Sequence, residues 1–432
     1  MLIAVVRRVF RARHDNIAPH FTCARAVHGA YFGRMARAAR PDIQEKDLHG
    51  FKHFKLLLPV MEKLPRAGCA RDRAGNRILH FDQYAALILL YFFNPIVTSL
   101  RAIQQTSQLQ KVQRLLGCSR AALGSLSEAA RVFDADLLRG VIGELVNTLQ
   151  PLHGASAFGD IPGVLTLVDG TLLPALPKLV EAFWLDDRNK AFKVHTQFEL
   201  LKGVPVRMDL TDGNGNEREV LESTLQAGRV YVMDRGYLKF DLFRKIMDIG
   251  SSFVCRLREN TAFEVVAQRP LSADAVSAKI VRDVVVRLSG GKAEGCLADR
   301  PLRVVDIRCA PRRTTGRRPG DAGPTQGETI LIVTDLLDVP AEVIALIYKH
   351  RWAIETFFRF FKQVLGCRHL LSHCENGIAI QTYLGIIACL LIALWTGRKP
   401  TLRTYEMICY YFSGLASEEE LLAHLQKLPP QS

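Results

Sequence analysis

The hydrophobic pattern of this chain changes near residue 160, and that change limits the folds that the chain can adopt. Between about 50 and 150, apolar residues recur at helical spacing, as in FDQYAALILLYFF (81–93). After 160, short runs rich in Val, Ile and Phe follow one another, which is typical of strands. The pattern therefore predicts a helical N-terminal part, followed by a part that is built on a β-sheet.

Four apolar runs define the centre of the second part. They are VLTLVD (164–169), AFKVHTQFEL (191–200), GVPVRMDLTDG (203–213) and RVYVMD (229–234). The helical segment NEREVLESTLQA (216–227) precedes the last run, and the short LKG turn between the second and third runs predicts a hairpin. Three strands, a helix and a fourth strand predict an α/β fold with a mixed sheet and a helix on its face.

A later stretch, YKHRWAIETFFRFFK (348–362), predicts a helix with two chemically different faces. At about 100° per residue, four polar side chains fall in one stripe roughly 60° wide: Tyr348, Arg351, Glu355 and Lys362. The other face is apolar and is expected to pack into a core, through Ile354, Phe357, Phe358 and Phe361. A packing helix needs no such stripe, which therefore indicates a functional surface. An alternative stays open, in which Arg351 and Glu355 form a structural ion pair.

Two of the predicted strands end on an acidic residue in a similar way. Asp169 follows an apolar run in VLTLVDGT, and Asp234 follows another in RVYVMDRGY. One such Asp is usually a turn residue, but carboxylates at the ends of adjacent strands, together with Glu355, can converge. Carboxylate oxygens are ligands that Mg²⁺ or Mn²⁺ prefers, and two such ions about 4 Å apart support in-line phosphoryl transfer. The cations of the stripe would then hold DNA phosphates.

The polar stripe also has the spacing of a known signature: Tyr, two residues, Arg, three residues, Glu, six residues, Lys. With VDGT and MDRGY before it, the chain resembles, from about 50 to about 415, the DDE transposases of bacterial insertion sequences in group four, the YREK group. The resemblance implies an RNase H-like catalytic core with an inserted β-rich subdomain. It also implies that Asp169, Asp234 and Glu355 form the catalytic triad that binds Mg²⁺ or Mn²⁺.

The same resemblance implies contacts with DNA. Tyr348, Arg351 and Lys362 match the residues that grip the transposon end. Trp352 follows the signature Arg, where it either stacks on an unpaired base or packs at the helix edge. The implied partner is double-stranded DNA, as terminal inverted repeats and as target, with a homodimer in the synaptic complex.

The patterns and the resemblance together predict the domain organisation. A basic, disordered tail covers 1–48, and a helical domain that either binds DNA or only packs covers 49–155. The RNase H-like catalytic domain is formed by 156–251 and 339–415, around a β-rich insertion at 252–338, and a tail covers 416–432. The insertion carries a basic loop that we expect to contact the DNA backbone, through Arg312, Arg313, Arg317 and Arg318.

The composition is typical of a globular protein that binds a polyanion. The chain has 432 residues with 48% hydrophobic and 23% charged, which excludes a disordered chain, and a net charge of +14, which favours nucleic acid as partner. The ten Cys residues do not have the spacing of a disulfide framework, and we find no three-part signal peptide, so we expect a cytoplasmic protein. The resemblance implies a bacterial protein that is nucleoid-associated when bound to DNA. The apolar run YLGIIACLLIALW (383–395) predicts a buried core helix and no membrane partner.

We therefore expect a DNA transposase that cuts at the terminal inverted repeats of its element and joins the 3′ ends to target DNA. Two alternatives stay open. An RNase H-like nuclease would use the same triad without strand transfer. A relic of a transposase would bind DNA without catalysis.

Overall fold

The computed structural model describes residues 64, 78–151, 158, 161–174, 191–289, 297, 300–309, 329–364, 370–372 and 374–427. The predicted tail at 1–48 and the predicted DNA-contacting loop lie outside the described residues, the latter with Arg312, Arg313, Arg317 and Arg318.

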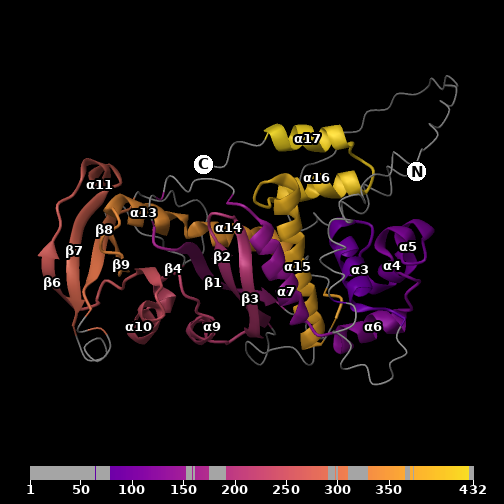
Figure 1. The fold of residues 1–432 in the computed structure, drawn as a ribbon, viewed down its shortest axis with the longest axis horizontal. Coiled ribbons are helices and arrows are strands. Elements are labelled where there is room, and N and C mark those ends of the chain that lie inside the picture. Colours follow the sequence, from indigo (N-terminus) through magenta and orange to yellow (C-terminus); the bar gives the residue numbers. More distant parts are fainter. Residues whose placement is uncertain are drawn as a thin grey trace, which may run out of the picture. The chain divides into compact units, whose positions relative to one another are not determined.

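A nine-stranded mixed sheet runs through the described part, in the order β3-β2-β1-β4-β5-β9-β8-β7-β6 (Figure 1). The strands β1, β4 and β5 run parallel to one another, and all the other neighbouring pairs are antiparallel. The predicted α/β class with a mixed sheet is confirmed. The strands are β1 (Val164–Pro174), β2 (Ala191–Glu199), β3 (Val204–Asp212), β4 (Arg229–Met233), β5 (Ser252–Arg256), β6 (Phe263–Gln268), β7 (Ile280–Leu288), β8 (Leu302–Arg308) and β9 (Thr329–Thr334).

The first half of the sheet follows the predicted order of three strands, a helix and a fourth strand. Strands β2 and β3 form the expected hairpin, and Gly203 in its turn has φ +66°, a left-handed conformation that glycine adopts without strain. Helix α9 (Glu217–Ser223) begins after Asn216, whose side chain accepts a hydrogen bond from the N–H of Arg218. The chain then enters β4 beside β1.

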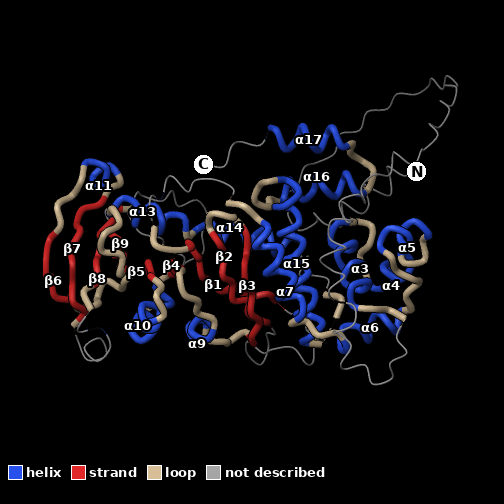
Figure 2. The backbone as a smooth tube through the Cα atoms, in the orientation of Figure 1, coloured by secondary structure: helices blue, strands red, loops and turns tan. Residues whose placement is uncertain are grey.

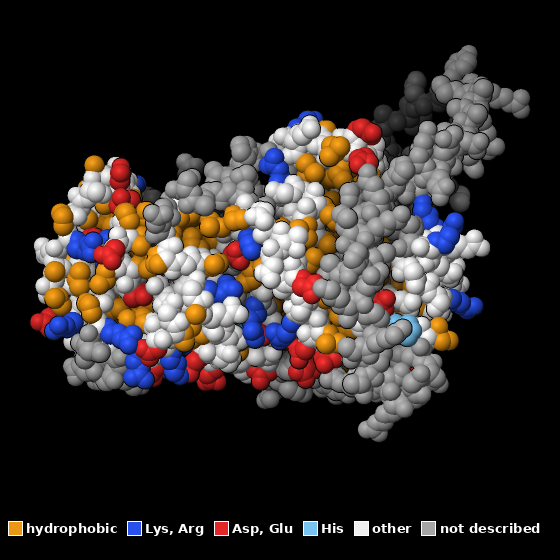
Figure 3. All heavy atoms as spheres, viewed as in Figure 1, with side chains coloured by type: hydrophobic (Ala, Val, Ile, Leu, Met, Phe, Trp, Pro, Cys, Tyr) orange, Lys and Arg blue, Asp and Glu red, His pale blue; other side chains and the backbone are white. Residues whose placement is uncertain are grey.

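The strands after β5 extend the same sheet. Strand β9 pairs with β5, and β8, β7 and β6 follow outward. Strand β6 and helix α11 (Ala273–Ser277) were not predicted from the sequence. Strand β6 is an edge strand whose residues are mostly exposed, so it carries no buried alternation. Hydrophobic side chains gather over β6 and β7 on the left of Figure 3. Val265 and Val266 of β6 and Val281 of β7 are among the exposed hydrophobic residues. The domain boundaries given above stay a prediction.

The two faces of the first half of the sheet pack against different helices (Figure 2). Side chains alternate along a strand, so Leu165 and Leu167 of β1 face one way and Val168 the other. The first face packs with α14 (Trp352–Val364), α15 (Glu375–Thr396) and α7 (Leu137–Thr148). The second face packs with α9 and α10 (Phe240–Asp248).

The helical N-terminal part contains α3 (Phe81–Phe93), α4 (Leu100–Thr106), α5 (Gln110–Leu116) and α6 (Leu123–Val132), as well as α7. Ser99 caps α4 through its side chain, and Gly117 ends α5 with φ +60°. Helix α3 begins after His80, and α6 begins after Ala122. A DNA role for this part stays a prediction.

The C-terminal helices complete the described part. Helix α13 (Ala341–His350) precedes α14, and α16 (Leu402–Phe412) and α17 (Glu418–Lys427) follow α15. Helix α15 is long and apolar enough to cross a membrane by length and composition, but most of it is buried inside the protein. The prediction of a buried core helix here is confirmed.

Candidate active site

Two aspartates lie side by side on neighbouring parallel strands. Leu167 of β1 pairs with Val232 of β4, so two residues further along each strand Asp169 and Asp234 reach the same level. Asp234 directly follows β4, as predicted. Asp169 does not close its strand, because β1 continues beside β2 as far as Pro174. Strand β4 stops at this level, which leaves one side of β1 without a paired strand at Asp169.

The turn after β4 fixes the orientation of Asp234. Its Oδ1 accepts a hydrogen bond from the backbone N–H of Gly236 at 2.7 Å, at the start of the 3₁₀ helix η3 (Arg235–Tyr237). A Cβ on Gly236 would lie 2.9 Å from that oxygen, which explains the glycine in MDRGY. Strand alternation directs Asp234 away from Tyr231 and Met233, toward the face that packs with α14.

The predicted signature helix is two helices. Helix α13 ends at His350 and α14 begins at Trp352, and the N–H of Arg351 donates to the carbonyl of Tyr348 at 3.1 Å in a turn tighter than an α-helix. The expected continuous stripe is therefore interrupted at Arg351. The apolar face is confirmed as buried, through Ile354, Phe357, Phe358 and Phe361.

Arg351 joins two members of the predicted triad. Its Nη2 lies 2.7 Å from Glu355 Oε1, and its Nη1 lies 3.6 Å from Asp169 Oδ2. One guanidinium thus brings the carboxylate of α14 and the carboxylate of β1 together. The contact with Glu355 is also the i, i+4 ion pair of the alternative interpretation. The structure therefore contains that pair.

The surroundings of Asp169 shift its acidity. Burial raises the pKa of its carboxyl to about 7, and the nearby carboxylates Asp234 and Glu217 also raise it. Arg351 and the N–H of Gly170, which donates to Oδ1 at 2.8 Å, act in the opposite direction on this pKa. A buried group of carboxylates of this kind is stabilised by a cation.

The donor set fits a hard divalent metal, because all three predicted ligands are carboxylates. Their present arrangement is organised around Arg351 instead. In the part of the chain that the structure describes, no group of three or more His, Cys, Asp or Glu residues is arranged to hold a metal ion. The chemistry of the donors fits the ion, while their positions fit the guanidinium.

Three predicted site residues remain: Tyr348 and Lys362 of the signature, and Trp352 beside its Arg. Burial raises the pKa of Tyr348 to about 12, and nearby Asp234 also raises it, so Tyr348 stays a protonated phenol that can donate a hydrogen bond. Trp352 is 40% exposed, which leaves its ring accessible to a partner. Lys362 is partly buried, two helical turns beyond Glu355 on α14. Their predicted contacts with DNA stay predictions.

Sequence analysis missed a fourth carboxylate beside the site. Glu217 begins α9 on the other face of the sheet, where its Oε1 lies 3.3 Å from Lys193 Nζ. A Cβ on Gly170 would lie 2.7 Å from the same oxygen, so the glycine of VDGT makes room for Glu217. That glycine was the only sequence signal, since no spacing relates Glu217 to Asp169.

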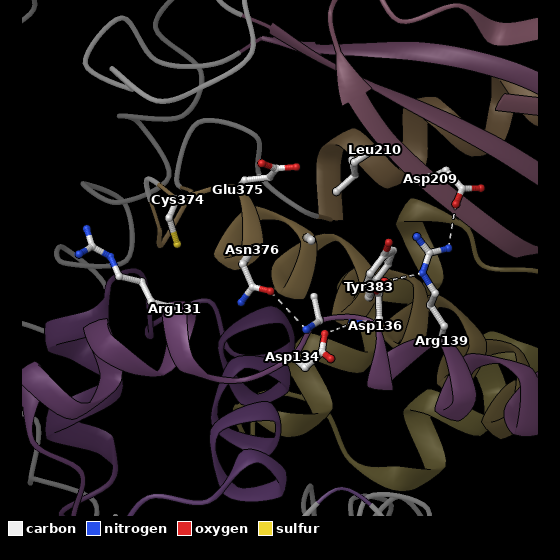
Figure 4. A pocket seen from close by; sticks show the side chains of 12 residues that line it. Arg131, Asp134, Asp136, Arg139, Asp209, Leu210, Cys374, Glu375, Asn376 and Tyr383 are labelled. Carbon is white, nitrogen blue, oxygen red and sulfur yellow. Dashed lines mark hydrogen bonds and ion pairs between the residues drawn. The ribbon is translucent and has the colours of Figure 1, made fainter. Parts of the chain in front are cut away.

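A separate hollow lies between α6, α7, β3 and the start of α15 (Figure 4). Three of its charged side chains, those of Arg139, Asp136 and Asp209, form ion pairs. Arg139 lies 2.8 Å from both Asp136 and Asp209 and sits over the ring of Tyr383, while Asn376 donates to a carbonyl of α6. The hollow is thus a polar joint between helices and the sheet, distinct from the carboxylate group.

Comparison with known proteins agrees with this geometry. Residues 161–391, more than half of the chain, match the family described as "Transposase DDE domain". A putative transposase of Sinorhizobium fredii is 29% identical over 233 residues, which cover 54% of this chain and 60% of that protein. A probable transposase for insertion sequence element IS5377 of Geobacillus stearothermophilus is 24% identical over 305 residues, 70% of this chain and 74% of that protein.

A solved piggyBac transposase synaptic complex with hairpin DNA matches over 90% of this chain and 87% of that chain, at 10% identity and a TM-score of 0.38, a likeness too weak to support a conclusion. The match over more than half of the chain defines the class, a DDE transposase. The chain belongs to this family, as the group-four signature predicted, and two of its relatives are described as probable or putative transposases for insertion sequence elements.

Proposed function

We propose that this transposase cuts DNA at the terminal inverted repeats of its own element and joins the freed 3′ ends to target DNA. The observation that carries the proposal is the position of Asp169 and Asp234 at one level of two parallel strands, with Glu355 tied to Asp169 through Arg351. The matched part of the chain spans about 60% of the rhizobial relative, so the full activity is inferred from this site.

The catalytic core is proposed to be RNase H-like. The strand order β3-β2-β1-β4-β5, with an antiparallel hairpin followed by parallel strands, supports this assignment. In that arrangement β5 belongs to the core, so the proposed insertion between the second Asp and the Glu begins after β5, later than the predicted residue 252, and contains strands β6–β9.

Asp169, Asp234 and Glu355 are proposed to hold Mg²⁺ or Mn²⁺. When bound, the metal would activate the attacking oxygen and stabilise the leaving oxygen of a phosphodiester. The backbone N–H groups of Gly170 and Gly236 orient the two aspartates. This positioning leaves fewer degrees of freedom to fix when substrate arrives.

Arg351, Lys362 and Tyr348 are proposed to hold the DNA end. A guanidinium and an ammonium offset the repulsion between carboxylates and a phosphodiester, and the phenol of Tyr348 donates to a phosphate oxygen. The net charge of +14 supports double-stranded DNA as the partner. A homodimer in the synaptic complex and a cytoplasmic location are part of the same proposal.

The test uses the purified protein, a labelled duplex of the element end and Mg²⁺. We expect the mapped cut positions to lie at the element boundary. When a second duplex is added, we expect a product in which the cut 3′ end is joined to that duplex. Cutting without a joined product would identify a nuclease instead. Binding without cutting would identify a relic.

A further inference from the structure

The guanidinium of Arg351 occupies the place where a cation is needed. It lies between the carboxylates of Glu355 and Asp169, at 2.7 Å and 3.6 Å. A divalent ion held between the same two carboxylates would compete with Arg351 for Glu355 Oε1 and Asp169 Oδ2. An ion bound between these carboxylates would lie next to the guanidinium, and the two positive charges would repel each other.

Both carboxylate oxygens of Asp169 already have a partner in this arrangement. Its Oδ1 accepts the N–H of Gly170 at 2.8 Å, and its Oδ2 faces Arg351. The neighbouring Asp234 uses Oδ1 for the N–H of Gly236. The backbone bonds hold the two aspartates in place, so the group that can move away is the Arg351 side chain.

We infer that Arg351 is an internal placeholder for the metal, which leaves the carboxylates when a DNA phosphate draws its guanidinium away. The inference rests on the proposed function and adds the order in which DNA and metal bind. Without DNA, Arg351 competes with divalent metal for Asp169 and Glu355. With DNA, the phosphate becomes the partner of Arg351 and the carboxylates become available.

The exposure of the three side chains suits such an exchange. They are 16% exposed at Arg351, 20% at Asp169 and 31% at Glu355, so a phosphate can approach the group. A phosphate offers the guanidinium the same bidentate, charge-assisted bonds that a carboxylate offers. Arg351 also sits between α13 and α14, outside the regular hydrogen bonding of either helix, where its side chain can turn without disturbing a helix interior.

The exchange would couple DNA and metal by linkage. If DNA makes the carboxylates available to metal, metal must strengthen DNA binding by the same factor. The protein would then carry little metal until it holds an element end. Cleavage of DNA that does not engage Arg351 would be suppressed.

The first test measures Mn²⁺ binding to the DNA-free protein by electron paramagnetic resonance. We expect Arg351→Ala to bind Mn²⁺ about tenfold more tightly than the parent, within the usual range of such couplings. The matched control is Arg359→Ala on the same helix, which removes an exposed arginine that bonds Thr356. Equal affinity in Arg351→Ala and the parent would overturn the inference, and so would an equal gain in Arg359→Ala.

A second set of variants separates this inference from the proposed function. Asp169→Asn in the Arg351→Ala background should lose the tight Mn²⁺ site. If the double variant keeps that site, the assignment of Asp169 as a ligand fails, and the proposed function fails with it. If Asp169→Asn alone removes Mn²⁺ binding while Arg351→Ala matches the parent, only the placeholder role is wrong. Arg351→Gln, with thermal melts, replaces the Ala variant if that variant does not fold.

Discussion

Two arginine–carboxylate groups in this transposase differ in how far they are removed from solvent. Arg303 on β8 and Asp283 on β7 are 2% and 3% exposed, and Arg303 makes two bonds to that carboxylate, at 2.8 Å and 2.7 Å. Arg351 is more open to solvent and is divided between two carboxylates. The difference separates an arginine that holds the fold from one that is available to a ligand.

The bonds of Arg303 explain why it has to stay in place. Its Nη1 donates to the carbonyls of Leu336, Leu337 and Val339 in the connection from β9 to α13. The buried pair therefore fixes the start of α13, and through it the position of Arg351 and α14. The site depends on a fixed arginine in the sheet extension and on a replaceable one among the carboxylates.

The largest expected effect is on DNA cleavage by the carboxylates near Arg351. Asp234→Asn keeps the shape of the side chain and its bond to Gly236 but removes a charged metal ligand, so we expect at least about a thousandfold loss of strand cleavage. Affinity for the element end should stay the same or rise. Mapped cleavage of labelled duplex, beside a gel-shift titration, measures both. Cleavage close to the parent level would remove Asp234 from the triad.

The buried group should show the largest loss of stability. Arg303→Met leaves Asp283 as a buried charge without its main partner, which we expect to lower the free energy of unfolding by about 3–5 kcal/mol. Urea denaturation measures the loss. Arg303→Met with Asp283→Leu should recover most of it, because both charges are then gone. A loss below about 1 kcal/mol in the single variant would mean that the two arginine groups are alike.

A buried histidine, His195 on β2, extends the comparison. Among the described residues it has no ion pair with a carboxylate such as the one that Arg303 forms with Asp283. Burial lowers the pKa of His195 to about 4, and Lys193 lowers it further, while Asp209 raises it. The folded state keeps the ring neutral, with Nε2 bonded to Thr211 Oγ1 at 2.8 Å and no partner for Nδ1 among the described residues.

This histidine predicts a pH dependence of stability. His195 takes up a proton near pH 6.5 in the unfolded chain and only near pH 4 in the folded chain. The contribution of the neutral ring to the free energy of unfolding is therefore present above pH 6.5 and is lost as the pH falls toward 4. The loss should be on the order of 2 kcal/mol. Unfolding midpoints between pH 4 and 8 should vary less in His195→Gln than in the parent. An unchanged slope would contradict the assignment.

The smallest effect concerns DNA binding without metal. Arg351→Ala and Lys362→Ala should each weaken binding to the element end in EDTA by about tenfold, because each removes a charged donor to phosphate. Glu355→Gln should not weaken it. Thermal melts should change little, since the apolar face of α14 is untouched. Equal affinity of all three variants and the parent would leave Arg351 and Glu355 as a structural pair only.

The sequence predicted the parts of the site that depend on local pattern. Apolar runs predicted β1 to β4, and the acids beside them predicted Asp169 and Asp234, because hydrophobic alternation is set by near neighbours. The signature spacing gave Glu355 and its neighbours. Asp169 and Asp234 lie at the same level because β1 and β4 pair in parallel with a particular register. That pairing joins segments that are distant in the sequence, and a single sequence does not reveal it.

The missed features share that non-local origin. The break at Arg351 accompanies contacts of its side chain with β1 as well as with α14, and helical periodicity carries no sign of it. Glu217 reaches the site only because α9 packs across β1 at Gly170. The pairing of Arg303 with Asp283 joins two strands whose partners become known only with the sheet order.

The most direct test of the account is a crystal structure of the protein with an element-end duplex and Mn²⁺, using the anomalous signal to locate the ion. We predict Mn²⁺ bound by Asp169, Asp234 and Glu355, with the Arg351 guanidinium on a DNA phosphate. Mn²⁺ bound elsewhere, with Arg351 still between Asp169 and Glu355, would contradict both the proposed catalytic site and the placeholder role of Arg351.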